Sequence, residues 1–310
     1  MDTGPAIAAI DCGTNSTRLL VTDASGRPME RLMRITRLGQ GVDATGRLAP
    51  EAVARCLAVL TEFRGVMDGL GVGRGRLVAT SAARDAANGA DFLDAAGEVT
   101  GLAPELLTGL DEGRLSMAGA VADLDPAEGP FLVLDIGGGS TELIAADGPD
   151  DPDLAAVSLQ LGCVRLSERF LTGDPPTPGQ LDAAEGEVAA QVEAAIAAHP
   201  RYLDTRRLVG LAGTVTTIAS LDQGLVDYDR DRIHHSVLRA DDVDGWLRRL
   251  AAEPAEARLA RPGMVPGRED VIVGGALILD VVLRRFGFTE CLVSEADILD
   301  GLVASQLLRS

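Results

Sequence analysis

The sequence contains no lysine, so all 28 of its basic side chains are arginine. A chain without lysine cannot form a Walker A phosphate loop, because that loop places a lysine on the phosphates. Acidic residues outnumber arginines by 47 to 28, which gives a formal net charge of −19. This balance disfavours non-specific nucleic-acid binding, and an anionic substrate would need local arginines or a metal ion to offset the overall field.

Aromatic residues and cysteines are also scarce. Aromatics make up 3% of a chain that is 46% hydrophobic, so the core is built from small aliphatic side chains. The four cysteines lie far apart without a CxxC pair, which argues against zinc and against a disulfide framework. We find no secretory signal pattern, and the apolar run VIVGGALIL is too short to span a bilayer. These absences predict a cytoplasmic protein that binds neither membrane nor nucleic acid.

Two glycine-rich stretches share one pattern. The first reads AIAAIDCGTNSTRLLVTD and the second, at residues 131–147, reads FLVLDIGGGSTELIAAD. Six identities recur at one constant offset: Asp11 and Asp135, Gly13 and Gly137, Ser16 and Ser140, Thr17 and Thr141, Leu19 and Leu143, Asp23 and Asp147. The repetition indicates an internal duplication of one domain plan.

Each glycine-rich stretch reads as a strand, a tight turn and a second strand. Rossmann and P-loop patterns instead run from a strand into a helix. A hairpin turn can still bind phosphate, because successive N–H groups form an anion-binding concavity. Downstream, alternating helices and strands include helices expected at 50–70, 81–101 and 179–199. The pattern predicts an α/β protein with domains at 1–125 and 126–296, and a final helix at 297–310 that can pack against the first domain.

The paired loops DCGTNSTRLL and DIGGGSTE resemble the phosphate loops of the actin-like ATPase, Hsp70 and sugar-kinase superfamily. Four further stretches resemble the exopolyphosphatase and guanosine pentaphosphate phosphatase (Ppx/GppA) family: TSAARDAAN at 80–88, LDEGRLSMAGA at 110–120, LGCVRLSERF at 161–170 and LAGTVTTIASL at 211–221. The resemblance covers nearly the whole chain and is closest to short, two-domain members. It implies two ribonuclease H-like domains with mixed sheets flanked by helices, a cleft between them, and a homodimer.

Asp135 and Glu142 flank the triple glycine. Two acids on one hairpin suit a hard divalent cation held through oxygen ligands, so Mg²⁺ or Mn²⁺ is expected there. The resemblance associates both residues with metal binding and catalysis, and Asp11 is the equivalent metal candidate in the first loop. In an isolated hairpin, a turn-capping Asp and a solvated Glu would be the better interpretation, but the duplication and the four other motifs reverse this preference.

The resemblance places a catalytic glutamate, the general base that activates water, at Glu112. Taken alone, a glutamate at a helix start is usually explained by compensation of the helix dipole. Most family members read Glu-Glu-Ala here, whereas this chain reads Asp-Glu-Gly. We therefore expect Gly113 to loosen the start of this helix.

Backbone amides, hydroxyls and arginines are expected to hold the substrate phosphates. For Arg18 and Arg84, surface salt bridging is an equally weighted alternative. Arg165 and Glu168 match the family without an assigned role. His234 and His235 are adjacent, so on regular structure they would point apart, and a structural role is expected. The predicted phosphate contacts are Gly13, Thr14, Asn15, Ser16, Arg18, Arg84, Gly137, Gly138, Gly139, Ser140, Thr141, Gly213 and Thr214.

The sequence thus predicts a metal-dependent exopolyphosphatase that removes the terminal phosphate of inorganic polyphosphate. Three alternatives stay open. Guanosine pentaphosphate could replace polyphosphate as the substrate, with guanosine tetraphosphate as a further ligand. An actin-like kinase or ATPase would need a nucleotide pocket that the motifs do not indicate. A catalytically weak sensor of polyphosphate or of the guanosine alarmone is the third, and the Asp-Glu-Gly sequence around Glu112 leaves it open.

Overall fold

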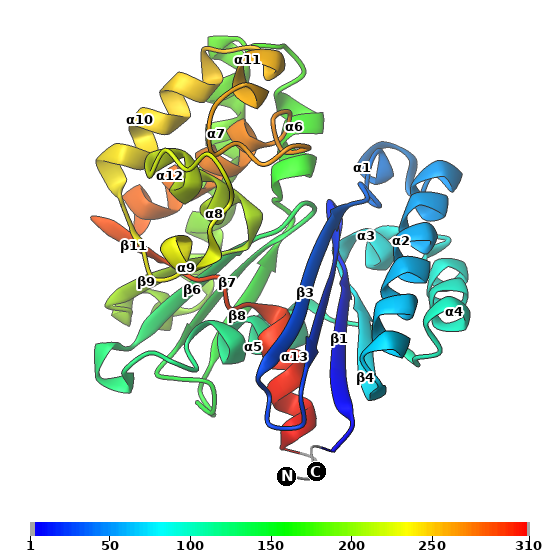
Figure 1. The fold of residues 1–310 in the computed structure, drawn as a ribbon. Coiled ribbons are helices and arrows are strands. Elements are labelled where there is room, and N and C mark those ends of the chain that lie inside the picture. The colour runs from blue at the N-terminus through cyan, green and yellow to red at the C-terminus, as the bar shows by residue number, and fades with distance from the viewer. Residues whose placement is uncertain (1–3, 309–310) are drawn as a thin grey trace. The chain divides into compact units, whose positions relative to one another are not determined.

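The computed structural model describes residues 4–308, which divide into two compact units (Figure 1). Residues 4–119 and 297–308 form the first unit, and residues 120–296 form the second. The boundary expected after residue 125 lies a few residues beyond Gly119, where the first unit gives way to the second. The last helix, α13 (Ile298–Leu307), belongs to the first unit. Within the described residues, no helix is both long and apolar enough to cross a membrane.

The first unit is built on a five-stranded mixed sheet of order β3-β2-β1-β4-β5. β1 and β2 form the predicted hairpin, and β3 continues it antiparallel. β4 and β5 run parallel to β1, so they reach it through helical crossovers. The strands are β1 (Ala6–Cys12), β2 (Ser16–Thr22), β3 (Pro28–Ile35), β4 (Val72–Ala79) and β5 (Pro104–Leu106).

Helices cover both faces of this sheet (Figure 1). Because side chains alternate along a strand, Ala8 and Ile10 pack against α2 (Pro50–Gly69) and α4 (Gly89–Thr100), whereas Ala9 packs against α13. Leu115 of α5 (Gly109–Ala120) packs on the α13 side. The short helix α1 (Val42–Thr45) comes after the edge strand β3 in the chain.

The prediction of one helix over 81–101 is wrong, because the segment forms two helices. α3 (Ser81–Asp85) ends at Ala86, which is extended, and α4 begins at Gly89. A Cβ on Gly89 would lie 2.0 Å from the carbonyl oxygen of Ala83, so the two helices approach at a point where only glycine fits. Helical periodicity continues across such a break and does not reveal it.

The second unit repeats the plan with one added strand, in the order β10-β11-β9-β6-β7-β8. β6 and β7 form the second predicted hairpin, β8 extends it antiparallel, and β9 runs parallel to β6. This matching order confirms the α/β class with mixed, helix-flanked sheets and supports the duplication read from the two loops. The strands are β6 (Phe131–Ile136), β7 (Thr141–Ala146), β8 (Ala155–Leu159), β9 (Arg207–Leu211), β10 (Val237–Arg239) and β11 (Glu290–Val293).

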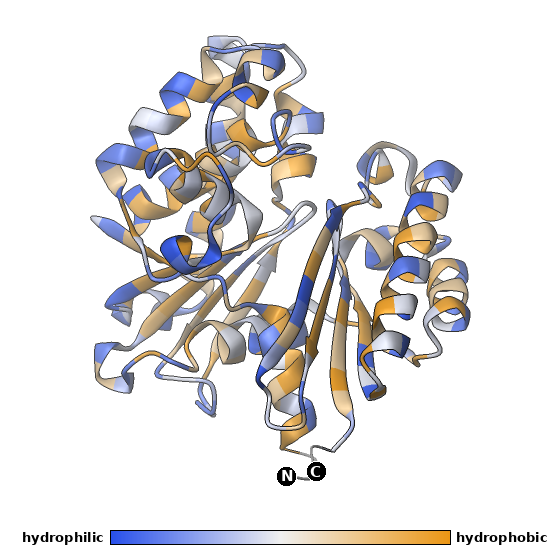
Figure 2. Ribbon diagram, viewed as in Figure 1, coloured by the Kyte–Doolittle hydropathy of each residue, from blue (hydrophilic) through white to orange (hydrophobic). Residues whose placement is uncertain are grey.

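Helices α7, α8, α10 and α12 bury one face of the second sheet in an aliphatic core. Figure 2 shows apolar residues concentrated along the strands and on the helix faces turned toward them. α7 begins with a capping box at Thr177, and Pro178 follows the cap in the first turn. The helices are α6 (Cys163–Phe170), α7 (Pro178–Ala198), α8 (Ala212–Asp222), α9 (Arg230–Ile233), α10 (Ala240–Ala251), α11 (Ala255–Leu259) and α12 (Ile272–Phe286).

Candidate active site

In the first unit, three predicted groups follow the carboxyl ends of three parallel neighbours. β1 leads into the glycine turn at 13–15, β4 into α3 with Arg84, and β5 into α5 with Glu112. Carboxyl ends of parallel strands share one edge of a sheet, which is where ligands bind in open α/β sheets. The topology therefore gathers the first loop, Arg84 and Glu112 at one edge.

The first turn is held from one side by residues 36–39. The Thr14 carbonyl accepts from the amide of Gly39 at 2.9 Å, and the Asn15 carbonyl accepts from Thr36 at 3.0 Å. In a trans peptide, the N–H group points away from the carbonyl of the same plane. The amides of Asn15 and Ser16 therefore point away from this segment. The Thr14 hydroxyl lies 2.9 Å from the Ser81 hydroxyl, so it ties the turn to α3.

Glu112 lies in the first turn of α5 and is 8% exposed. Arg84 donates to its Oε2 at 3.4 Å and to the carbonyl of Leu107 at 3.0 Å. Arg84 thus holds the carboxylate that the resemblance assigns as the base. The helix runs unbroken through Gly113, and the expected loosening of its start stays a prediction.

Arg18, expected on the phosphates, contacts two carboxylates within the first unit. Its Nη2 donates to Oδ2 of Asp11 at 2.5 Å, and its Nη1 donates to Asp297 at the start of α13. Asp11 lies in β1 and is 2% exposed. Burial raises the pKa of Asp11 despite the adjacent Arg18 guanidinium. The positive charge of Arg18 is thus already offset, and Asp11, the third predicted metal ligand, already contacts a cation.

In the second unit, the triple-glycine turn follows the carboxyl end of β6. The first residues of α6 hold its carbonyls: Gly137 accepts from the amide of Cys163 at 2.9 Å, and Gly138 from that of Val164 at 2.9 Å. Nε of Arg165 donates to the Gly139 carbonyl at 2.8 Å. By the same planarity argument, the amides of Gly138, Gly139 and Ser140 point away from α6. Successive N–H groups of a turn, when they are directed to one side, suit phosphate oxygens.

Arg165 and Gly162 both contact the triple-glycine turn, which the sequence did not predict. The Gly162 backbone approaches the turn so closely that a Cβ there would lie 2.2 Å from the carbonyl oxygen of Gly138. Arg165 matched the family without an assigned role, and its side-chain bond to the Gly139 carbonyl and its backbone bond to the Gly138 carbonyl show that it supports the turn. The family-like stretch LGCVRLSERF was the available signal.

Asp135, Glu142 and Ser158 form one row across β6, β7 and β8. Asp135 pairs in register with Glu142, and Glu142 with Ser158, so their side chains project from the same face. Asp135 is 7% exposed and Glu142 is 1% exposed. The Ser158 hydroxyl donates to Oε1 of Glu142 at 2.7 Å. The equivalent row in the first unit is Asp11, Arg18 and Met33.

This donor set fits a hard divalent cation. Two carboxylates directly opposite each other repel, and a divalent cation bound through their oxygens offsets that repulsion. In the first unit the residue opposite Asp11 is Arg18, so a guanidinium of the protein itself neutralises this carboxylate. Asp135 and Glu142 could therefore hold Mg²⁺ or Mn²⁺, whereas the contact with Arg18 makes Asp11 a poorer candidate.

The predicted third turn, at Gly213 and Thr214, follows the carboxyl end of β9, the parallel neighbour of β6. The guanidinium of Arg268 packs against Gly213, where a Cβ would lie 1.8 Å from its nitrogens. Arg268 is 9% exposed, so a cation lies buried beside the α8 N-terminus. An anion at this terminus would meet both the helix dipole and Arg268. Sequence reasoning missed Arg268, which lies in the stretch PGRED.

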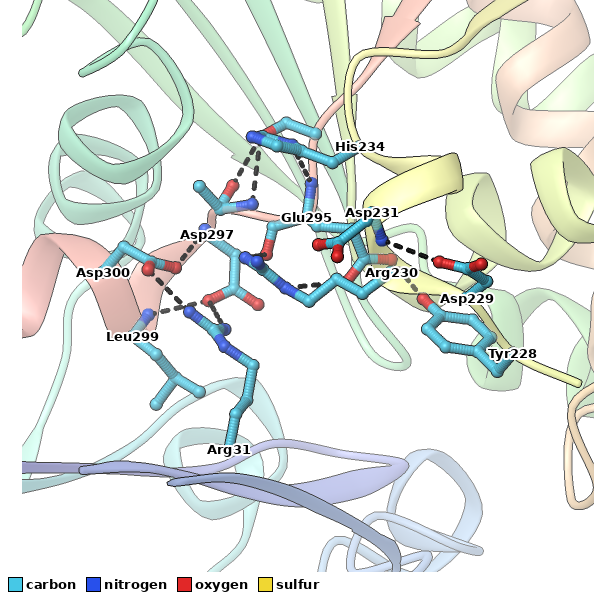
Figure 3. A network of polar contacts seen from close by, with 12 residues as sticks. Arg31, Tyr228, Asp229, Arg230, Asp231, His234, Glu295, Asp297, Leu299 and Asp300 are labelled. Atoms are coloured by element: carbon cyan, nitrogen blue, oxygen red, sulfur yellow. Dashed lines mark hydrogen bonds and ion pairs between the residues drawn. The ribbon is translucent and has the colours of Figure 1, made fainter. Parts of the chain in front are cut away.

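His234 and His235 do not point apart as expected, because His235 has a left-handed backbone (φ 61°). Their ring centroids lie 3.8 Å apart with the planes tilted by 30°, and both rings face Asp123, which lies 3.2 Å from Nε2 of His234. Nδ1 of His234 accepts from the amide of Glu295 at 3.1 Å (Figure 3). The neutral ring therefore carries its proton on Nε2, which donates to Asp123. In this tautomer both ring nitrogens of His234 are occupied by hydrogen bonds, so His234 is a poor metal ligand.

Comparison with known proteins agrees with this geometry. The model of the Ppx/GppA phosphatase family matches residues 20–310. Exopolyphosphatase 2 of Mycobacterium tuberculosis is 43% identical over 96% of this chain and 98% of its own length. The crystal structure of an exopolyphosphatase-like protein superposes with a TM-score of 0.92 at 34% identity, covering 99% of both chains. The Aquifex aeolicus PPX-GPPA enzyme gives 0.81 at 31% identity, covering 97% of this chain and 99% of its own. The resemblance read from the loops is confirmed: the chain belongs to the Ppx/GppA phosphatase family.

Proposed function

We propose that this protein is a metal-dependent exopolyphosphatase, which hydrolyses the terminal phosphoanhydride bond of inorganic polyphosphate and releases orthophosphate. The observation that carries the proposal is the opposed, buried pair of Asp135 and Glu142 beside an amide-lined glycine turn. The 43% identity to an exopolyphosphatase over nearly the full length supports this substrate class.

The chain's own groups account for substrate binding. The amides of the two glycine turns donate to phosphate oxygens, and the α8 N-terminus with Arg268 offers a third anion-binding position. These contacts suit phosphoryl transfer, in which positioning and charge stabilisation supply most of the catalysis. A divalent ion bound by Asp135 and Glu142 would neutralise charge on the transferred group.

Glu112 acts as the general base. Its carboxylate accepts a proton from the attacking water, while the contact with Arg84 fixes its orientation at the start of α5. This role rests on the family resemblance together with the burial of Glu112 and its place at the carboxyl edge of the first sheet. The predicted cleft and the homodimer stay predictions.

The test is phosphate release from short and long polyphosphate, guanosine pentaphosphate and ATP, with Mg²⁺ or Mn²⁺ and with EDTA. We expect release of orthophosphate from polyphosphate that EDTA abolishes and either metal restores. Faster release from guanosine pentaphosphate would change the substrate and keep the chemistry. Release of ADP only when a phosphate acceptor is present would favour a kinase, and binding of polyphosphate without turnover would favour a sensor.

A further inference from the structure

Ser158 lies directly opposite Glu142 on neighbouring antiparallel strands. Its hydroxyl donates to Oε1 of Glu142 at 2.7 Å, a usual distance for a hydrogen bond between a hydroxyl and a carboxylate. Glu142 is 1% exposed and Ser158 is partly exposed, so the acceptor end of this bond is buried and only the donor end lies near water. The bond restricts rotation about the last side-chain torsion of Glu142, so its second oxygen has one preferred direction.

The first unit supplies a natural comparison. The row Asp135, Glu142, Ser158 corresponds there to Asp11, Arg18, Met33. Where the middle residue is an arginine, the third residue is an apolar Met33 that donates no hydrogen bond. Where the middle residue is a carboxylate, the third residue is a hydroxyl donor. The hydroxyl donor is thus present only in the row whose middle residue is a carboxylate, and it can orient that carboxylate.

We propose that Ser158 is the positioning residue for the metal ion: it orients the Glu142 carboxylate as a ligand beside Asp135. Groups that hydrogen-bond to ligands in this way orient them, and their loss typically lowers metal affinity about 10- to 100-fold. The proposal rests on the metal role of Asp135 and Glu142 in the proposed function. In this role Ser158 acts through Glu142.

Two substitutions of equal shape separate the hydroxyl from the packing. Ser158→Thr keeps the hydroxyl and Ser158→Val removes it, and both residues favour a β-strand. Binding of Mn²⁺ is measured in the absence of substrate from the EPR signal of the free ion. We expect Ser158→Val to raise the dissociation constant about 10-fold or more and Ser158→Thr to keep it close to that of the native protein.

Activity provides the second readout. Ser158→Val should need a higher Mg²⁺ concentration for half-maximal phosphate release, while the KM for polyphosphate at saturating metal stays unchanged. Equal Mn²⁺ affinity in the Val and Thr variants would overturn the proposal. Thermal unfolding of both variants verifies that they fold, and Ser158→Ala, which needs no added volume, replaces the Val variant if that one is unstable.

The failure of this proposal can be distinguished from the failure of the proposed function. Suppose that Ser158→Val binds Mn²⁺ more weakly than the native protein and Ser158→Thr, but the native protein releases no phosphate from polyphosphate. That result refutes only the activity. If the native protein releases phosphate but the Ser158→Val and Ser158→Thr variants bind Mn²⁺ equally well, only the role of Ser158 is refuted.

Discussion

Arg18 and Asp11 lie directly opposite each other on β2 and β1 and form an ion pair at 2.5 Å. Their counterparts in the second unit, Glu142 and Asp135, are both acids. One copy of the duplicated hairpin thus carries its own cation, and the other presents two carboxylates. The first pair thus contains its own counter-charge, and the second is the pair that we propose as the metal site.

Loss of Arg18 should destabilise the protein. The variant Arg18→Met leaves Asp11 buried without this partner, and breaking a buried ion pair on one side costs about 3 kcal/mol or more. Burial already raises the pKa of Asp11 above its unfolded value, so ionisation of this carboxyl costs folding stability as pH rises through the folded value, and removal of the Arg18 charge increases that cost. We therefore expect the decrease in melting temperature to be larger at pH 8 than at pH 5.

The matched control for this variant is Arg74→Met, which removes an exposed arginine from β4. It should change the melting temperature little. If Arg18→Met left stability intact and instead raised the KM for polyphosphate, Arg18 would be a phosphate ligand, as the sequence predicted.

Glu112→Gln should lower kcat about 10²- to 10⁴-fold, because the amide cannot accept the proton of the attacking water. The KM should change little, since the side chain stays almost isosteric. Steady-state phosphate release measures both constants. Asp111→Asn provides the control, because Asp111 is exposed and bonded to Thr108. Sustained turnover by Glu112→Gln would remove Glu112 from the role of base.

Arg165→Met should raise the KM for polyphosphate more than it lowers kcat. Without the bond from Nε to the Gly139 carbonyl, that peptide plane is free to rotate and the Ser140 amide loses its fixed direction. We expect about a tenfold or larger change, since one hydrogen bond from a charged group contributes roughly 1.5–3 kcal/mol and about 1.4 kcal/mol corresponds to a factor of ten. Arg169→Met, at an exposed position on the same helix, is the control. Equal KM values for the two variants would contradict the assignment.

Acidification should destabilise the second unit through His234. Burial lowers the pKa of His234, and the electrostatic effect of the neighbouring His235 ring lowers it further. A group with a depressed folded-state pKa binds fewer protons folded than unfolded, so stability is present above about pH 6.5 and is lost as pH falls through the folded value. Protonation would also require the loss of the bond from the Glu295 amide to Nδ1.

The measurement is the melting temperature between pH 7.5 and pH 5. His234→Gln should show a smaller decrease over this range than the native protein, because its side chain does not titrate. His199→Gln removes an exposed imidazole at the end of α7 and should behave as the native protein does. A native-like pH dependence in His234→Gln would exclude His234 as the titrating group.

The sequence was sufficient for features that depend on neighbours along the chain. Alternating apolar strands, glycine turns and the repeated spacing predicted both hairpins, and the structure has them at β1–β2 and β6–β7. The motifs also indicated the family, which the comparisons confirm. Local periodicity failed at Ala86, because helical spacing continues across a short extended break.

The partner of each polar group was decided only by the tertiary structure. Arg18 has the charge and loop position of a phosphate ligand, yet Asp297, distant in sequence, competes for its guanidinium. Ser158 carries no motif, and its role follows from the strand register that places it opposite Glu142. The sequence by itself determined which residues could bind phosphate or metal; the packing of strands and helices far apart in the chain determined which carbonyls are held, which amides are presented and which charges are already paired.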